Sequence, residues 1–141
     1  MSYLLDTNIV SEWVKPRPEP KVVNWLADID EDRVFLSVVT LAELRHGVER
    51  LSASRRRTRL DEWLRHDLPA RFEGRVLPMD ETIAAAWGVI VARREAKGRP
   101  IGVMDAWIAA TAETHELTLV TRNAADFRDA VSAVLDPWAS S

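Results

Sequence analysis

The sequence predicts an α/β fold, a three-layer sandwich in which a mostly parallel central sheet carries helices on both faces. Short apolar runs of strand length alternate along the chain with amphipathic segments of helical period. This alternation is typical of parallel sheets, because the crossover between two parallel strands is usually a helix. The chain has 141 residues, 47% of them hydrophobic, so one domain is expected at residues 1–136, with a short tail at 137–141.

The first half of the chain is expected to begin with a strand at residues 3–5, which the polar residues 6–8 end before a helix follows. A proline-rich loop at residues 16–20 separates that helix from a second one at about 22–29. A buried strand at residues 33–37 leads into a third helix, for which Thr40 is the expected cap. This helix is expected to form a hairpin with the charged stretch at residues 55–64.

The second half repeats the alternation of strands and helices. A strand is expected at residues 75–78, and a long helix at 80–96 ends at a Lys-Gly-Arg-Pro turn. A further helix at about 103–115 precedes a strand at 117–120 and a last one at 131–135. No internal repeat interrupts this order.

Charge and cysteine content limit the function classes. The net charge of −3 argues against a protein that binds nucleic acid mainly through a broad basic surface. It does not exclude an enzyme that acts on RNA, since a divalent cation held by carboxylates reverses the local field. The absence of cysteine excludes disulfides and thiolate zinc sites. With no apolar run of about 18 residues and no basic leader, a cytoplasmic location is expected.

Four acidic residues fall where a parallel sheet binds its ligands, beyond the carboxyl ends of the strands. Asp6 ends the first strand, and Glu43 is placed in the first turn of the helix after the second. Asp105 opens the helix before the fourth strand, and Asp126 follows that strand by a few residues. We expect all four carboxylates to meet at one edge of the sheet.

Asp105 is the most informative of the four acids. It heads an apolar helical stripe that continues with Ile108, Ala109 and Ala112, so its carboxylate is expected to be buried. A buried carboxylate is costly unless it is paired or bound to a cation. The structural alternative is an acid in the first turn that interacts with the helix dipole and stays near water.

The other three acids also have structural alternatives. Asp6 has the position of a helix N-cap, Glu43 has capping-box spacing from Thr40, and Asp126 is typical of a turn. The coincidence of all four at one edge favours a shared site. Gly47, one turn beyond Glu43, costs about 1 kcal/mol in a helix interior, which indicates close approach of another group there.

The available ligands indicate a hard cation. Carboxylate oxygens, without cysteine and without a histidine pair at metal-binding spacing, favour Mg²⁺, or alternatively Mn²⁺, over zinc. We interpret the three histidines as ordinary residues: His46, His66 and His115.

The four acids belong to longer motifs that follow one another along nearly the whole chain. These are LLDTN at residues 4–8, TLAEL at 40–44 with Gly47, MDAWIAA at 104–110 and TRNAADF at 121–127. Together they resemble the PIN-domain toxins of bacterial type II toxin–antitoxin pairs, of the VapC and FitB type. The similarity extends from about residue 2 to about residue 136.

This resemblance implies a PIN-like sandwich with magnesium-dependent endoribonuclease activity, usually homodimeric. It also implies inhibition by a cognate antitoxin, through which alone the chain would meet DNA. Many members have an aspartate where this chain has Asn123, so three roles stay open for Asp126: binding metal directly, binding it through water, or only supporting another ligand. The implied acidic positions are Asp6, Glu43, Asp105 and Asp126, with Asn8, Thr121 and Asn123 as polar neighbours.

The expected roles follow from what phosphodiester hydrolysis needs. Asp6 and Asp105 are the expected principal metal ligands, Glu43 a ligand or general base, and Asp126 a supporting ligand. The arginine run at residues 55–59 is interpreted as a solvated helix face in preference to an RNA contact. Core packing is expected for five tryptophans, with Trp138 left open: Trp13, Trp25, Trp63, Trp87 and Trp107.

Three rival functions remain to be compared with this one. In the first, the acids only cap helices and the chain is a non-catalytic dimeric partner of a DNA-binding antitoxin. A phosphatase with Asp6 as nucleophile is disfavoured, because Asn8 stands where a second aspartate would be required. A dinucleotide-binding fold is disfavoured because no Gly-x-Gly-x-x-Gly follows the first strand.

Overall fold

Five short strands form the central sheet of the computed structural model, which describes residues 1–139. Their order across the sheet is β3-β2-β1-β4-β5, and every neighbouring pair is parallel. All carboxyl ends therefore lie along the same edge, with the first strand of the chain at the centre. The strands are β1 (Tyr3–Leu5), β2 (Val34–Ser37), β3 (Val76–Leu77), β4 (Thr118–Val120) and β5 (Val134–Leu135).

Helices cover both faces of this sheet, as predicted. Successive strand residues point to opposite faces, so Leu4 and Leu119 join one buried cluster whereas Leu5 and Val120 join the other. The first cluster is packed by α6 (Glu81–Ala96) and α7 (Val103–Thr114). The second is packed by α1 (Thr7–Glu12), α2 (Pro20–Asp28) and the segment α4 (Arg55–Glu62), η2 (Trp63–Asp67) and α5 (Leu68–Arg71).

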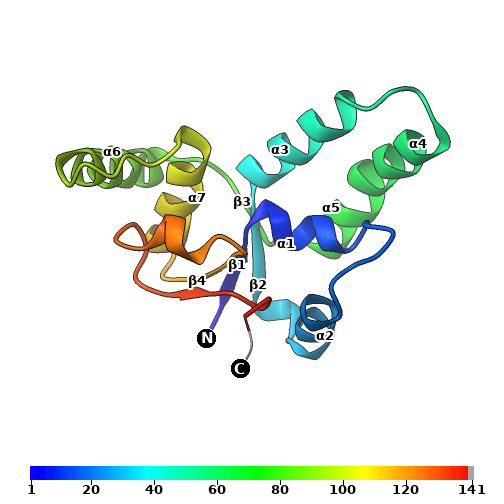
Figure 1. Ribbon diagram of the computed structural model, residues 1–141, viewed down its shortest axis with the longest axis horizontal. Coiled ribbons are helices and arrows are strands. Elements are labelled where there is room, and N and C mark those ends of the chain that lie inside the picture. The colour runs from blue at the N-terminus through cyan, green and yellow to red at the C-terminus, as the bar shows by residue number, and fades with distance from the viewer. Residues whose placement is uncertain (140–141) are drawn as a thin grey trace.

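Two helical arms stand on either side of the strands' carboxyl ends (Figure 1). One arm is formed by α6 and α7, in which Trp87 stacks on Trp107 with ring centroids 5.2 Å apart. The other is formed by α3 (Val38–Glu49) and α4. Because β1 ends between the arms, the residues that follow it lie at the base of the space they enclose.

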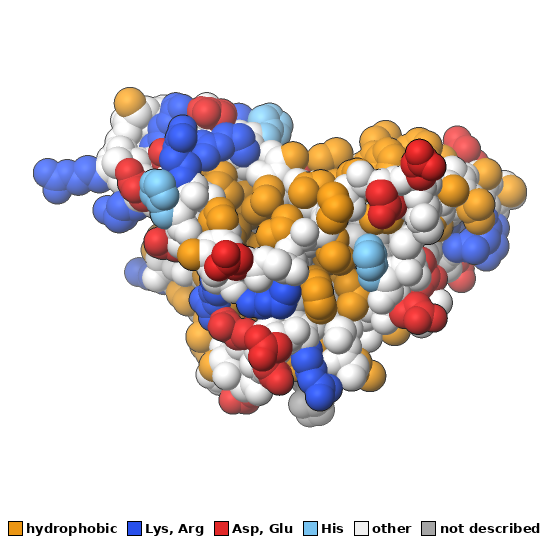
Figure 2. All heavy atoms as spheres, turned by 180° about the vertical axis from the view of Figure 1, so that it is seen from behind, with side chains coloured by type: hydrophobic (Ala, Val, Ile, Leu, Met, Phe, Trp, Pro, Cys, Tyr) orange, Lys and Arg blue, Asp and Glu red, His pale blue; other side chains and the backbone are white. Residues whose placement is uncertain are grey.

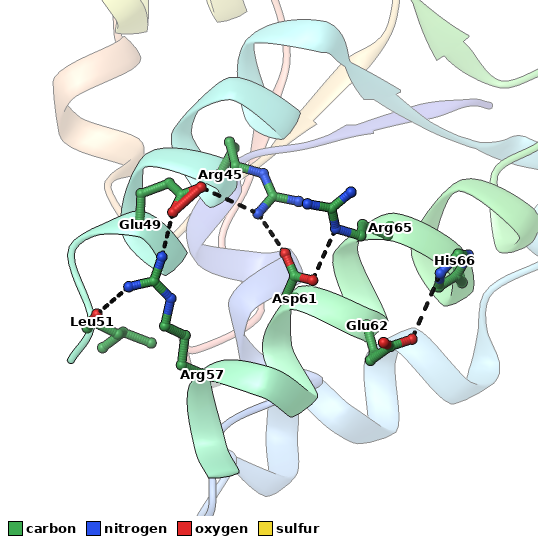
Figure 3. Close-up of polar contacts among 8 residues, drawn as sticks. All are labelled: Arg45, Glu49, Leu51, Arg57, Asp61, Glu62, Arg65 and His66. Carbon is green, nitrogen blue, oxygen red and sulfur yellow. Dashed lines mark hydrogen bonds and ion pairs between the residues drawn. The ribbon is translucent and has the colours of Figure 1, made fainter. Parts of the chain in front are cut away.

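Ion pairs join α3 to α4, and α4 to η2, and they confirm the predicted hairpin (Figure 3). Asp61 accepts from Arg45 Nη1 at 2.7 Å and from Arg65 Nε at 2.8 Å. The hydrogen bond from Arg45, followed by that from Arg65, holds the pKa of the Asp61 carboxyl below its usual value. Arg57 pairs with Glu49 and donates to a carbonyl of the connecting turn.

The largest departure from the predicted elements follows α4. The expected helix at residues 55–64 continues through a π-helical segment, in which the backbone N–H of Leu68 bonds to the carbonyl of Trp63, and then through α5. Pro69 has no N–H to donate, so the regular hydrogen-bond ladder cannot pass through it unchanged. Two short 3-10 helices were also not predicted, η1 (Glu31–Arg33) and η3 (Ala124–Phe127).

The start of α3 is a second correction. Ser37, not Thr40, caps this helix: its hydroxyl accepts from the backbone N–H of Val39 at 3.0 Å. The buried, β-branched run before Thr40 resembles strand continuation in sequence, yet Val38 is already helical. Within residues 1–139, none of the helices has the length and apolar character needed to cross a membrane. The expected tail at 137–141 reaches residues 140–141, which lie outside the described residues.

Candidate functional site

Asp6 is held at the carboxyl end of the central strand. Its side chain is 5% exposed and caps α1, with Oδ1 accepting from the backbone N–H of Thr7 at 2.8 Å. Oδ2 accepts from the hydroxyl of Thr121 at 2.8 Å and from the amide of Asn8 at 3.5 Å. The structural and functional interpretations of Asp6 therefore coexist, since the residue caps a helix and also faces the acidic edge.

Burial raises the pKa of the Asp6 carboxyl from 3.8 to about 6. The hydrogen bonds from Thr121 and Thr7 oppose this shift, while the negative charges of Asp105 and Glu43 add to it. Asp6 is thus an acid whose ionised form is poorly solvated by the protein. A cation at this position would stabilise the ionised form.

Glu43 contacts the start of α1 rather than capping its own helix. The hydroxyl of Thr7 donates to Glu43 Oε1 at 2.7 Å, and Thr7 also lies 3.3 Å from the hydroxyl of Thr40. Since α3 begins at Val38, Glu43 lies in the second turn, and the expected first-turn position and capping box are wrong. This outcome removes the main structural explanation for Glu43.

Asp105 is half-buried in the first turn of α7, above a stripe in which Ile108, Ala109 and Ala112 are fully buried. Burial raises the pKa of the Asp105 carboxyl, and the charges of Glu43 and Asp126 raise it further. Asp126 is exposed on η3. Electrostatic repulsion thus links Asp6, at the end of β1, with the acids on α3, α7 and η3.

The polar neighbours connect α1 to the loop after β4. Thr121 is buried, and its hydroxyl accepts from Asn8 Nδ2 at 3.4 Å and from the backbone N–H of Asn123 at 3.0 Å. The backbone N–H of Arg122 donates to Asn8 Oδ1 at 3.2 Å. Asn123 contributes its main chain, since its side chain forms no cap for η3.

Thr7 belongs to this site but was not predicted from the sequence. Its backbone holds Asp6 while its hydroxyl holds Glu43, so one residue positions two acids. The available signal was its place directly after Asp6 at the strand end. Its contact with Glu43 joins residues 36 positions apart and needs the packing of α1 against α3.

The sequence matches the model of the PIN domain family over residues 3–131. The chain belongs to this family. It is 42% identical over 135 residues to toxin FitB of Neisseria gonorrhoeae, covering 96% of this chain and 97% of that protein. It is 34% identical to the VapC ribonuclease Y4jK of Sinorhizobium fredii, with 96% of both chains covered. The match is thus to whole toxin chains of the FitB and VapC type.

Solved structures agree with this assignment to the PIN family. The structure of FitAB bound to the IR36 DNA fragment contains a chain that superposes with a TM-score of 0.93 at 38% identity, covering 99% of this chain and 97% of that one. A DNA-bound VapBC complex from Salmonella typhimurium superposes with a TM-score of 0.80 at 29% identity, covering 97% and 98%. PIN-domain nucleases are generally metal-dependent.

The acids of this PIN domain suit a divalent cation in chemistry. None of Asp6, Glu43, Asp105 and Asp126 forms an ion pair with a basic side chain of residues 1–139, so their mutual repulsion is not neutralised within the chain. In the described residues, however, no three Asp, Glu or His side chains already form a metal-binding group. Glu43 is turned toward Thr7, and Asp6 toward Thr7 and Thr121. A metal ion would therefore have to draw the carboxylates closer together than they lie in this structure.

A groove of about 270 Å³ begins at the site and runs between α1, α3 and the α4–η2 segment. Thr7 and Glu43 lie at its acidic end, and Leu44, Gly47 and Trp63 line its length. A Cβ atom on Gly47 would meet nothing within 4 Å. The close approach expected at Gly47 is therefore not made by this chain, and the missing side chain keeps the groove open.

The arginine run is divided by its partners. Arg57 pairs with Glu49, whereas Arg55, Arg56 and Arg59 are exposed and have no ion-pair partner in residues 1–139. This exposure agrees with a solvated helix face. The five tryptophans expected in the core are partly buried against the two core clusters, and Trp138 packs there as well.

Proposed function

We propose that this chain is the toxin of a toxin–antitoxin pair and a Mg²⁺-dependent endoribonuclease that hydrolyses RNA phosphodiester bonds in the cytoplasm. The observation that supports this best is the gathering of four carboxylates, without a counter-charge, at the carboxyl edge of a parallel sheet. The names of relatives agree, among them a VapC ribonuclease and the tRNA(fMet)-specific endonuclease VapC of Shigella flexneri.

Asp6 and Asp105 are proposed as the principal metal ligands, because burial makes their ionised forms depend most on an added cation. Glu43 is proposed as a further ligand or as the general base that accepts a proton from water. Asp126, exposed at the rim, is proposed as a supporting ligand. Mn²⁺ would suit the same oxygen ligands.

The bound ion would supply an acidified water molecule and stabilise charge on the phosphorane oxygens. The chain's own contribution is to hold the carboxylates in place. Thr7 and Thr121 keep Asp6 oriented, and Thr7 keeps Glu43 beside it. In-line attack by water would break the bond between the phosphorus and the ribose 3′-oxygen. The products would be a 3′-hydroxyl and a 5′-phosphate. Asn8 fixes the loop after β4 relative to α1.

The groove beside the site is proposed to receive the antitoxin. An apolar stripe of the antitoxin would lie along Leu44, Gly47 and Trp63 near Trp13, and a basic residue would reach toward Asp6 and Asp105. Such a residue would neutralise the acids and compete with metal. Contact with DNA would be made by the antitoxin, in line with relatives whose complexes are described as DNA-bound.

A homodimer is proposed through the α6–α7 arm. Val89 and Val103 are 62% and 61% exposed there, and Met104 is 39% exposed beside the stacked Trp87 and Trp107. Hydrophobic side chains gather on this arm and toward the centre of the face shown in Figure 2. Exposed apolar patches of this kind are typical of association sites. Sedimentation at micromolar concentration that finds only monomer would contradict this proposal.

The nuclease proposal is tested with Asp105→Asn and a matched control, Asp32→Asn. Asp32 is exposed in η1, before β2 and thus away from the carboxyl edge. Cleavage of an RNA pool and Mg²⁺ binding by calorimetry are measured for wild type and both variants. We expect the first variant alone to lose both. Wild-type cleavage that persists in chelator would overturn the proposed role of the metal. Mg²⁺ binding unchanged by Asp105→Asn, with no cleavage by wild type, would favour the non-catalytic dimeric partner.

A further inference from the structure

A buried arginine lies behind the loop that carries Asp126. Arg94, in the last turn of α6, is 4% exposed and forms no ion pair with a carboxylate of residues 1–139. Its guanidinium donates instead to three main-chain carbonyls. Nε donates to Arg99 O at 2.7 Å, and Nη1 donates to Asp126 O at 3.0 Å and to Arg128 O at 3.2 Å.

This arrangement is costly if its only role is to fill the core. Removing a guanidinium from water carries a large desolvation cost, which an apolar side chain of similar size would avoid. The carbonyls recover part of that cost, because hydrogen bonds to a charged donor are stronger than neutral ones. Two of the three carbonyls belong to the segment that begins at Asp126. The hydrogen bonds that offset the desolvation of Arg94 therefore also fix the position of this segment.

Contacts of Phe127 and Asp129 also hold this segment in place. Phe127 is fully buried in the first core cluster. On the surface, Arg93 donates to the carbonyl of Asp129 at 3.0 Å, and Arg99 donates to its carboxylate at 3.1 Å. The main chain from 126 to 129 is thus held by the end of α6, whereas the Asp126 carboxylate accepts no hydrogen bond from residues 1–139.

We propose that Arg94 is a positioning residue for the nuclease site: by holding the Asp126 and Arg128 carbonyls, it fixes η3 so that the Asp126 carboxylate faces Asp105. The repulsion between these two acids agrees with that orientation. Arg94 forms no ion pair with any of the four carboxylates within residues 1–139, so it acts through the main chain of Asp126. This inference rests on the proposed function of the acidic site.

The test compares Arg94→Gln and Arg94→Lys with Arg93→Gln. The glutamine removes the charge, and the lysine keeps it but offers fewer well-placed donors. Arg93→Gln is the matched control, because Arg93 is the neighbouring residue, is exposed and holds a carbonyl beyond Asp126. Thermal melts show whether each variant folds. If Arg94→Gln does not fold, Arg94→Lys replaces it in every later measurement.

The first readout is local order in the metal-free protein. Hydrogen exchange is followed at the amides of Asp126 and Ala130, which bond to Asn123 O at 2.9 Å and Phe127 O at 3.0 Å. We expect faster exchange at these amides in the Arg94 variants and no change in β1. Unchanged exchange at both amides would overturn the inference whatever the activity.

The second readout separates positioning from general destabilisation. In Arg94→Gln we expect about tenfold weaker cleavage and a several-fold higher Mg²⁺ concentration for half-maximal rate, within the range seen when a residue supporting a metal ligand is removed. In an Asp126→Asn background the same change should cost less than about twofold, since the two residues act as one unit. Fully multiplicative losses would instead mark Arg94 as structural only.

The outcomes also separate this inference from the proposed function. If wild type neither cleaves RNA nor binds Mg²⁺, the nuclease proposal fails and Arg94 has no site to position. If wild type does both while Arg94→Gln retains wild-type cleavage and Mg²⁺ dependence, only the role of Arg94 is wrong.

Discussion

Two acids of the site, Asp6 and Asp126, are held in opposite ways. Asp6 is buried at the end of the central strand, and its carboxylate accepts hydrogen bonds from Thr7, Thr121 and Asn8. Asp126 is exposed on a single turn of 3-10 helix, and its carboxylate accepts none from residues 1–139. The first acid is held directly through its side chain, and the second only through its main chain.

This difference indicates a division of roles. An acid held by several donors keeps one orientation but has a raised pKa because of its burial. An exposed acid whose carboxylate accepts no hydrogen bond can turn toward a ligand. The buried Asp6 therefore suits the role of a permanent metal ligand, and the exposed Asp126 suits that of an adjustable one.

Removing the charge of Asp6 or of Asp126 should give the largest difference in cleavage rate. We expect Asp6→Asn to reduce Mg²⁺-dependent RNA cleavage more than about a hundredfold, beyond the range typical of residues that only support ligands. Asp126→Asn should reduce it about tenfold. Single-turnover cleavage of one RNA substrate by both variants checks this. Equal losses of cleavage in both variants would show that the two acids do not differ in role.

The second prediction concerns stability and pH without metal. The Asp6 pKa of about 6 in the folded protein exceeds the ordinary 3.8, so the folded state binds this proton more tightly than the unfolded state does. The associated stability is present below about pH 4 and is lost as pH rises through 6. The loss is at most about 3 kcal/mol, from a shift of roughly two pKa units.

Urea unfolding in chelator at pH 4.5 and pH 7.5 measures this effect. Asp6→Asn should lose less stability than wild type over that interval and should exceed it by about 2 kcal/mol at the higher pH. Asp126→Asn should retain most of the wild-type pH dependence, because Asp6 stays buried in that variant. Added Mg²⁺ should stabilise wild type and narrow the gap. A wild-type curve that rises with pH would contradict the assigned shift.

The third prediction concerns the hydroxyl that supports Asp6. Thr121→Val keeps the side-chain shape but removes a buried donor, and we expect the free energy of unfolding to fall by about 1 to 2 kcal/mol at neutral pH. Asn123→Ala is the matched control, because the Asn123 side chain caps nothing. Chemical denaturation of both variants decides the matter. Equal stability of the two would mean that Asp6 does not depend on Thr121.

The smallest expected effect is at Gly47, which lies along the groove beside the site. Gly47→Ala should stabilise the chain by about 0.5 to 1 kcal/mol, since alanine favours a helix interior and its Cβ meets no other atom within 4 Å. Cleavage should be unchanged. A longer side chain, as in Gly47→Met, should leave cleavage intact but weaken inhibition by the antitoxin. Full inhibition of that variant would place the antitoxin elsewhere.

The sequence predicted the strands, a mostly parallel sheet and the placing of four acids near strand ends, because each depends on local signals. Alternating apolar segments identified β1, β2 and β4, and the chemistry of strand ends identified Asp6. The cap of α3 was missed because Ser37 is itself the last residue of β2, so no turn marks the boundary. The contacts of Thr7 with Glu43 and of Arg94 with Asp126 join distant segments, so no local pattern indicates them.

The central place of β1 also has a consequence for synthesis of the chain. The first strand to be made pairs with β4 on one side, and its last residue is followed by an acid whose hydroxyl donor stands 115 positions later. A growing chain can form α1 and α2 early, but it cannot complete this edge until residue 121 has left the ribosome. The nuclease activity proposed here is consequently withheld from the nascent polypeptide by topology alone.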